Sequence, residues 1–97
     1  MEVKTLYTLT YSEQAIKDIA FFKKYGNESI RKKIDKLLKE LEEHPSTGTG
    51  KVEQLRFDLT GFWSRRINNE HRIVYKIDEN NKTVYIYRMK GHYLSSN

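Results

Sequence analysis

The chain opens with an alternation of side chains that predicts a β-strand over residues 3–10. Tyr7 and Leu9 fall on one face of this strand and Leu6 on the other, so we expect both faces to be at least partly buried. Helical spacing begins directly afterwards. Ser12 is suited to cap a helix, and an apolar stripe follows that ends near Gly26 and consists of Ala15, Ile16, Ile19, Ala20 and Phe22.

A second helix is expected almost at once, with Asn27 as its N-cap and Pro45 just beyond its end. Its apolar residues recur at the spacing of one buried helical face and are Ile30, Ile34, Leu37, Leu38 and Leu41. Because the connection between the two helices is so short, we expect them to be antiparallel neighbours in a helical hairpin.

After a loop of small residues at 46–50, the period becomes that of β-strands for most of the remaining chain. We expect strands over residues 52–59, 62–67, 71–77 and 83–88, with turns at 60–61, 68–70 and 78–82. Consecutive strands joined in this way form an antiparallel meander. The predicted order is therefore βααββββ, an α+β fold with the N-terminal helical hairpin packed on one face of a twisted, largely antiparallel sheet. A length of 97 residues suits a single domain over residues 1–97.

Composition narrows the class of protein. Hydrophobic residues make up 37% of the chain and aromatic residues 12%, which is enough for a folded core. The chain has no cysteine, so disulfides, a thiolate nucleophile and cysteine-ligated zinc are excluded, and a reducing compartment, the cytoplasm, is expected. No apolar run approaches the roughly 20 residues that span a bilayer, and we recognise no signal peptide, so no membrane association is expected.

The net charge of +5 is unevenly distributed along the chain. Residues 1–48 hold nine Lys/Arg against eight Asp/Glu, a net charge of +1, whereas residues 49–97 hold nine against five, a net charge of +4. The second half also contains Arg56, Arg65, Arg66, Arg72 and Arg88. Because the planar guanidinium suits phosphate, this half is a candidate surface for a polyanion, although a basic surface that only aids solubility explains the charge equally well.

Residues 48–51 (GTGK) invite comparison with a phosphate-binding loop. Such a loop needs GxxxxGK followed by Ser or Thr at the start of a helix, whereas Val52 and a predicted strand follow here. We therefore interpret the segment as a connection in which Lys51 can meet a phosphate. The histidines, His44, His71 and His92, lie in different elements without metal-ligand spacing, so no metal site is expected.

The remaining candidates are residue types suited to metal-free phosphoryl transfer within RNA. Cleavage through the RNA's own 2′-hydroxyl needs a base, cations that stabilise the charge developing on phosphorus, and an acid for the 5′-oxygen leaving group. Glu53, several arginines, and His92 with Tyr93 have this chemistry. Each also has a structural interpretation: Glu53 as a solvated strand charge, Arg72 as a surface partner of Glu70, and His92 as a terminal residue.

Two stretches of the predicted meander bear a family resemblance. Residues 61–67 (GFWSRRI) and 70–75 (EHRIVY), with residues 48–55 (GTGKVEQL) upstream and the pair His92-Tyr93 downstream, closely resemble the YoeB/Txe branch of the RelE/ParE toxin superfamily. These toxins belong to type II toxin–antitoxin systems. The resemblance covers roughly half of the chain at the level of motif, and the other half agrees in its pattern of elements.

The resemblance implies a RelE-like fold and a ribosome-dependent endoribonuclease that cuts messenger RNA in the ribosomal A site and so inhibits translation. It implies no cofactor, and products that end in a 2′,3′-cyclic or 3′-phosphate and a 5′-hydroxyl. By the same resemblance, Glu53 is the general base, Arg72 stabilises the transition state, His92 is the general acid and Tyr93 orients the substrate. The expected RNA contacts are Lys51, Arg56, Arg65 and Arg66.

The implied partners are the ribosome with its mRNA and a cognate acidic antitoxin of the YefM/Axe type that folds over the basic sheet. The resemblance also implies a homodimer. Leu94–Asn97 extend beyond the His-Tyr pair at which relatives tend to stop, and Gly91 can act as a hinge before it.

Two other functions stay open on the sequence. One is a toxin of the same fold that inhibits DNA gyrase, which would not need Glu53, Arg72 and His92 together. The other is a non-catalytic basic RNA-binding module that stacks bases on Trp63, Tyr85 and Tyr87, although these three residues are more simply interpreted as part of the core.

Overall fold

The computed structural model describes residues 6–91, which form two helices and five strands. In chain order the elements are β1 (Thr8–Tyr11), α1 (Glu13–Tyr25), α2 (Glu28–Glu43), β2 (Glu53–Gln54), the 3₁₀ helix η1 (Phe57–Leu59), β3 (Trp63–Arg66), β4 (Arg72–Asp78) and β5 (Thr83–Arg88). The strands make one sheet in the order β1-β5-β4-β3-β2. All neighbours are antiparallel except β1, which runs parallel to β5 with Thr8 opposite Thr83. The predicted α+β class and order of elements are confirmed.

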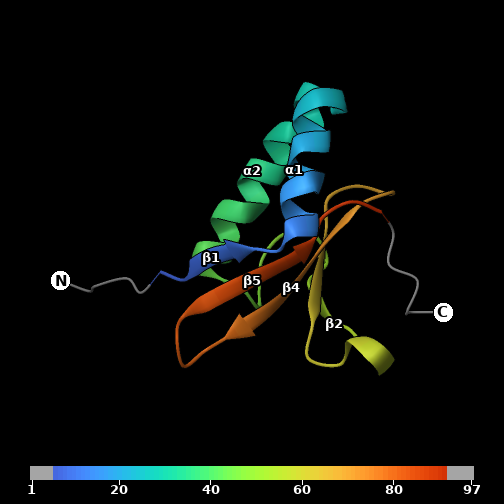
Figure 1. Cartoon of the computed structure of the whole chain (residues 1–97). Coiled ribbons are helices and arrows are strands. Elements are labelled where there is room, and N and C mark those ends of the chain that lie inside the picture. The colour runs from blue at the N-terminus through green and yellow to red at the C-terminus, as the bar shows by residue number, and fades with distance from the viewer. Residues whose placement is uncertain (1–5, 92–97) are drawn as a thin grey trace.

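Both helices lie on the same face of the sheet (Figure 1) and begin at the predicted caps. The Ser12 hydroxyl accepts a hydrogen bond from the Ala15 amide at 3.0 Å, and the Asn27 side chain accepts one from the Ile30 amide at 2.8 Å. The helix α2 ends at Glu43, and its C-cap His44 is followed directly by Pro45, which cannot continue the helix. No helix among residues 6–91 is long and apolar enough to cross a membrane.

The core lies between the helices and the central strands. Its members include apolar side chains of both layers: Ala15, Phe22, Ile34, Leu37, Leu41, Ile73, Tyr75, Val84 and Ile86. Burial of each large apolar side chain contributes about 1.5–3 kcal/mol relative to its exposure. The predicted stripe of α2 is confirmed, since its residues are buried or packed against the core.

The predicted stripe of α1 is partly wrong. Ala15 and Phe22 are buried as expected, but Ile16 is 58% exposed and Ala20 is also exposed. The buried position between them is Asp18, which is only 2% exposed. Positions 15, 18 and 22 share one helical face, so a carboxylate points toward the sheet and must find hydrogen-bond donors there.

The predicted strand over residues 52–59 is also wrong for most of its length. Only Glu53–Gln54 pairs with β3, and the chain then leaves the sheet to form η1. The reason is local: Phe57 adopts a positive φ of 58°, and the amides of Leu59 and Thr60 bond back to the carbonyls of Arg56 and Phe57. Such a turn breaks the extended backbone that a strand requires.

No helix of the described chain covers the second face of the sheet, which we call the open face (Figure 1). Strand alternation assigns to it the side chains of Ser64, Arg66, Arg72, Val74, Lys76, Tyr85 and Tyr87. Tyr85 and Tyr87 are 39% and 38% exposed, so their interpretation as core residues is wrong. Trp63 points to the other face and packs against the core, as predicted.

Candidate active site

Arg72 is the centre of the polar network on the open face. Its guanidinium donates from Nε to the Ser64 hydroxyl at 3.0 Å and from Nη2 to the Lys51 carbonyl at 3.2 Å. Its side chain is only 7% exposed, and its backbone amide donates to the Gly91 carbonyl at 3.3 Å. The first residue of β4 is therefore fixed by contacts with the neighbouring strand and loop and with the segment after β5.

Glu53 of β2 forms an ion pair with Arg72 of β4, and β3 lies between these two strands. In the pairing of β2 with β3, Glu53 lies opposite Ser64, and Ser64 is the residue whose hydroxyl receives the Arg72 hydrogen bond. The Glu53 carboxylate lies 3.0 Å from Arg72 Nη2, and its side chain is 57% exposed. The pair thus joins a buried, oriented cation to a carboxylate that solvent or a ligand can reach.

The loop before β2 reaches this site because Gly50 allows a close approach to β3. Its backbone has φ of +96°, and a Cβ added there would lie 2.7 Å from the Arg66 carbonyl oxygen and 2.8 Å from Arg65 Cγ. The Gly50 carbonyl in turn accepts the Arg66 amide. The absence of a side chain at Gly50 therefore lets the loop pack directly against β3. This packing brings the carbonyl of the next residue, Lys51, within reach of Arg72. The interpretation of residues 48–51 as a connection is confirmed, because the next element is the strand β2 and not a helix.

Two arginines face each other on the open face, since Arg66 of β3 pairs with Arg72 of β4. Burial lowers the pKa of the Arg72 guanidinium, the Glu53 carboxylate opposes this shift, and the charge of Arg66 adds to it. Like charges directly opposite each other on a sheet repel, and one carboxylate offsets only part of two positive charges. The electrostatics of this face therefore favour a bound anion.

Arg65 is placed differently from its neighbour. Its side chain is fully buried on the helical side of the sheet, where it donates to carbonyl groups of His44, Pro45 and Thr47 and pairs with the Glu40 carboxylate at 3.2 Å. Burial acts to raise the pKa of Glu40, but hydrogen bonds from Thr49 and the charge of Arg65 lower it below its ordinary value. Because no ligand can reach this guanidinium without unfolding the end of α2, the expected phosphate contact at Arg65 is not supported.

Of the other expected site residues, the structure describes Lys51 and Arg56. Lys51 is exposed in the adjoining loop, and Arg56 is exposed at the start of η1, beyond the end of β2. The predicted acid His92 and its neighbour Tyr93 lie outside the described residues. Among residues 6–91, no group of three or more His, Asp or Glu side chains is arranged to hold a metal ion.

Two residues without a predicted role fix the segment that leads to the His-Tyr pair. The buried Asp18 carboxylate accepts the amides of Met89 at 2.8 Å and Lys90 at 3.1 Å. The Nδ1 atom of His71, a residue that is 8% exposed, accepts the Gly91 amide at 2.9 Å. The sequence held a signal for Asp18, because a carboxylate within an apolar helical stripe needs buried donors.

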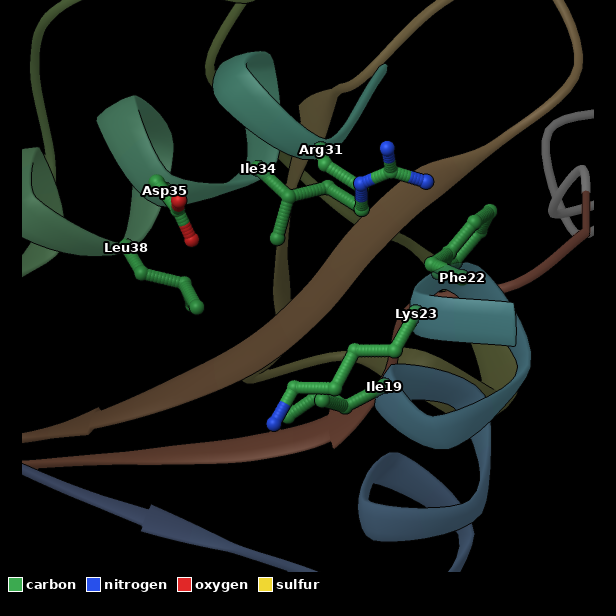
Figure 2. A pocket seen from close by; sticks show the side chains of 7 residues that line it. All are labelled: Ile19, Phe22, Lys23, Arg31, Ile34, Asp35 and Leu38. Atoms are coloured by element: carbon green, nitrogen blue, oxygen red, sulfur yellow. The ribbon is translucent and has the colours of Figure 1, made fainter. Parts of the chain in front are cut away.

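A separate pocket of about 150 Å³ lies between the two helices (Figure 2), on the side of the sheet opposite to Arg72. Its walls are mainly apolar, with charged groups only at Lys23, Arg31 and Asp35. The guanidinium of this pocket belongs to the exposed residue Arg31, whereas the Arg72 guanidinium on the open face is buried and held beside the Glu53 carboxylate. The open face is therefore the better candidate for chemistry.

Comparisons with known proteins identify the family of the chain. A family model described as "YoeB-like toxin of bacterial type II toxin-antitoxin system" matches residues 11–93. The chain is 38% identical to Toxin YoeB of Escherichia coli (strain K12) over 85 residues, which cover 88% of this chain and 98% of that protein. Two solved structures from Staphylococcus aureus are also similar. The YoeB dimer has a TM-score of 0.77 at 40% identity and the YoeB-YefM complex 0.76 at 42%, each covering 90% of this chain and 98% of that chain. The chain therefore belongs to the family of YoeB-like toxins of bacterial type II toxin–antitoxin systems.

Proposed function

We propose that this toxin is a ribosome-dependent endoribonuclease that cuts messenger RNA in the ribosomal A site and thereby stops translation. The observation that supports it best is the Glu53–Arg72 pair on the open face, with a nitrogen–oxygen distance of 3.0 Å. A reachable carboxylate beside a buried and oriented guanidinium provides a base and a phosphate-binding cation at one point.

The proposed chemistry assigns one step to each of these groups and to His92. Glu53 takes the proton from the RNA 2′-hydroxyl, and the 2′-oxygen attacks the adjacent phosphorus. Arg72 stabilises the negative charge that develops on the phosphoryl oxygens, with Arg66 as a second cation on the same face. The bond to the 5′-oxygen then breaks, and His92 donates the proton that this leaving group needs. The products end in a 2′,3′-cyclic phosphate, or a 3′-phosphate after hydrolysis, and a 5′-hydroxyl.

The hydrogen bonds of Arg72 explain how so small a chain could act in this way. Ser64 and Lys51 hold its guanidinium before any substrate binds, so little reorganisation is needed at the moment of reaction. Orientation of the RNA would come from the ribosome, which lowers the demand on the protein to supply a deep cleft. Lys51, Arg56 and Arg66 would contact the RNA backbone, and Tyr93 would orient the reacting nucleotide. No cofactor is required, and the site of action would be the cytoplasm, where ribosomes are found.

The partner that restrains the toxin is proposed to be an acidic antitoxin of the YefM type. Support comes from the Staphylococcus aureus YoeB-YefM complex, whose toxin chain is 42% identical to this one, and from the net charge of +4 in residues 49–97. The YoeB dimer of the same organism supports a homodimer of this chain.

The test is to add purified protein to a cell-free translation reaction and map the ends of the messenger by primer extension. The parent should produce new ends within translated codons, and only when ribosomes are present. Glu53→Gln, Arg72→Ala and His92→Gln should bind ribosomes and cut poorly. Glu13→Gln, which neutralises an exposed carboxylate in the first turn of α1, is the matched control and should cut like the parent.

Three results would contradict the proposal in different ways. New ends on naked RNA at the same rate would contradict ribosome dependence. Parental cleavage by all three site variants would contradict the assignment of residues while leaving the activity intact. Inhibition of DNA supercoiling by gyrase, without messenger cleavage, would identify the alternative class of toxin with the same fold.

A further inference from the structure

A group of aromatic rings and a lysine lies on the open face beyond the Glu53–Arg72 pair. We call Phe62, Lys76, Tyr85 and Tyr87 the aromatic platform. The rings of Phe62 and Tyr87 are 5.4 Å apart between centroids, and Lys76 Nζ lies 5.1 Å from the Phe62 centroid. Tyr85 and Tyr87 are more than a third exposed, whereas most large apolar side chains of β4 and β5 are buried.

The platform continues the surface on which the candidate chemistry lies. Phe62 lies directly before β3, two positions from Ser64, which is a separation of about 7 Å in extended backbone, and its ring contacts Tyr87 and Lys76 of the open face. Lys76 and Tyr85 are directly opposite each other in the pairing of β4 with β5. A chain of nucleotides that reaches Glu53 would therefore cross the platform if it follows the open face.

Local backbone contacts hold Tyr87 in its outward position. The pairing of β4 with β5 shifts register between Val74 and Tyr75, so Tyr87 has no directly opposite partner and the strand bulges there. The Tyr87 carbonyl accepts a hydrogen bond from the Ser12 hydroxyl at 2.5 Å, and the Ser12 amide donates to the Ile86 carbonyl at 2.9 Å. The exposed ring is thus fixed at its backbone and is not at a loop tip.

This combination of groups matches single-stranded RNA better than it matches a peptide. Successive bases stack on aromatic side chains, and a cation beside the rings attracts the phosphates between the bases. Arg66 and Arg72 on the same face extend the positive charge toward Glu53. An acidic peptide would use the charges but would gain little from flat ring faces.

We propose that the aromatic platform is a base-stacking subsite for single-stranded RNA, occupied by messenger nucleotides next to the one that is cut. The proposal rests on the proposed endoribonuclease function, which supplies the RNA. It adds a binding role for Phe62, Lys76, Tyr85 and Tyr87 that is independent of the cleavage step.

The test measures equilibrium binding without cleavage. Full-length protein carrying Glu53→Gln is titrated against a fluorescent single-stranded oligoribonucleotide and against the same oligonucleotide with abasic residues, and anisotropy is recorded at low salt. Tyr87→Leu is compared with Tyr87→Phe, which keeps the ring. Tyr25→Leu is the matched control, because Tyr25 is 66% exposed at the end of α1 and lies off the platform.

The proposal expects Tyr87→Leu to weaken binding of the intact oligonucleotide by about fivefold or more, the effect of losing one stacked base. Binding of the abasic oligonucleotide should change little, and Tyr87→Phe and Tyr25→Leu should bind like the parent. Fluorescence-detected unfolding checks that Tyr87→Leu is folded.

Several outcomes would overturn the proposal. Tyr87→Leu could weaken binding of both oligonucleotides equally or weaken neither, and the Glu53→Gln protein without a platform substitution could fail to bind RNA. Tyr87→Leu could also weaken binding of an acidic peptide while RNA binding stays unchanged. Because the readout is binding, a failed platform leaves the cleavage assay of Glu53→Gln untouched. Conversely, a chain that stacks RNA but does not cut it would refute only the proposed function.

Discussion

Arg65 offers a sharp test, because its neighbour Arg66 is chemically identical and faces the other side of β3. Replacement of Arg65 by Met removes donors to the Glu40 carboxylate and to the carbonyls of His44 and Thr47, which lie at 2.9 Å and 2.6 Å from Nη2. Loss of one partner of a buried ion pair costs about 3–5 kcal/mol. Since the Glu40 side chain is 23% exposed, water can solvate part of it, so we expect the lower end, about 3 kcal/mol.

That loss would be a large share of the roughly 5–15 kcal/mol that stabilises a domain of this size, and it would lower the Tm by at least about 12 °C. The assay is thermal and urea unfolding followed by the fluorescence of Trp63, the single tryptophan of the chain. Arg66→Met is the matched control, because its side chain is partly exposed on the open face, and its free energy of unfolding should change by less than about 0.5 kcal/mol.

The cleavage rate should show the reverse order: the variant with the larger loss of stability should keep its rate, and the stable variant should lose rate. Below its Tm, Arg65→Met should cut messenger at the parental rate per folded molecule, whereas Arg66→Met should cut more slowly. If Arg65→Met kept parental stability and lost cleavage, Arg65 would be a phosphate contact, and the argument from its burial would be refuted.

Three further predictions concern buried or partly buried polar groups. Asp18→Ala should lower the free energy of unfolding by about 2–4 kcal/mol, because it leaves the amides of Met89 and Lys90 without their acceptor. Hydrogen exchange of the Met89 amide, followed by NMR, should become faster, and unchanged exchange would refute the role of the carboxylate. His71→Phe keeps the ring but loses the acceptor for Gly91, so the Gly91 amide should exchange faster while global stability falls by only about 1 kcal/mol. Although desolvation acts to raise it, hydrogen bonds and a nearby guanidinium hold the Glu40 pKa below its ordinary value of 4.5, so its stabilisation is complete above pH 4.5 and is lost as the pH falls through the folded-state pKa. Unfolding of Glu40→Gln should therefore depend less steeply on pH below 4.5 than that of the parent, and equal slopes would contradict the assignment.

Most of the fold could be predicted because helix caps and short turns depend on residues that are close together in the sequence. The caps at Ser12 and Asn27 act within one helical turn, and the last strands follow one another with short turns. The parallel pairing of β1 with β5 has no such signal, since it joins Thr8 to Thr83 across nearly the whole chain. Likewise, the alternation of residues 52–59 does not predict the positive φ of Phe57, with which the chain turns away from the sheet after β2.

The site was only partly predictable for a related reason. A short turn after β3 places Arg66 opposite Arg72, so the proximity of these cations follows from the meander itself. The alternation of Trp63, Arg65 and Ile67 on one face does indicate burial of Arg65, but a charged residue type predicts exposure, so the two signals conflict at this position. The clamp of Asp18 on Met89 could not be foreseen, since it depends on how α1 packs over the end of β5.

The central claim is that Glu53 and Arg72 form a working catalytic pair, and single-turnover cleavage of messenger on programmed ribosomes tests it most directly. We predict that Glu53→Gln binds these ribosomes like the parent but cuts at least about 100-fold more slowly, the usual contribution of a general base. Glu13→Gln should keep the parental rate. Cleavage by ribosome-bound Glu53→Gln within a few-fold of the parent would contradict the claim.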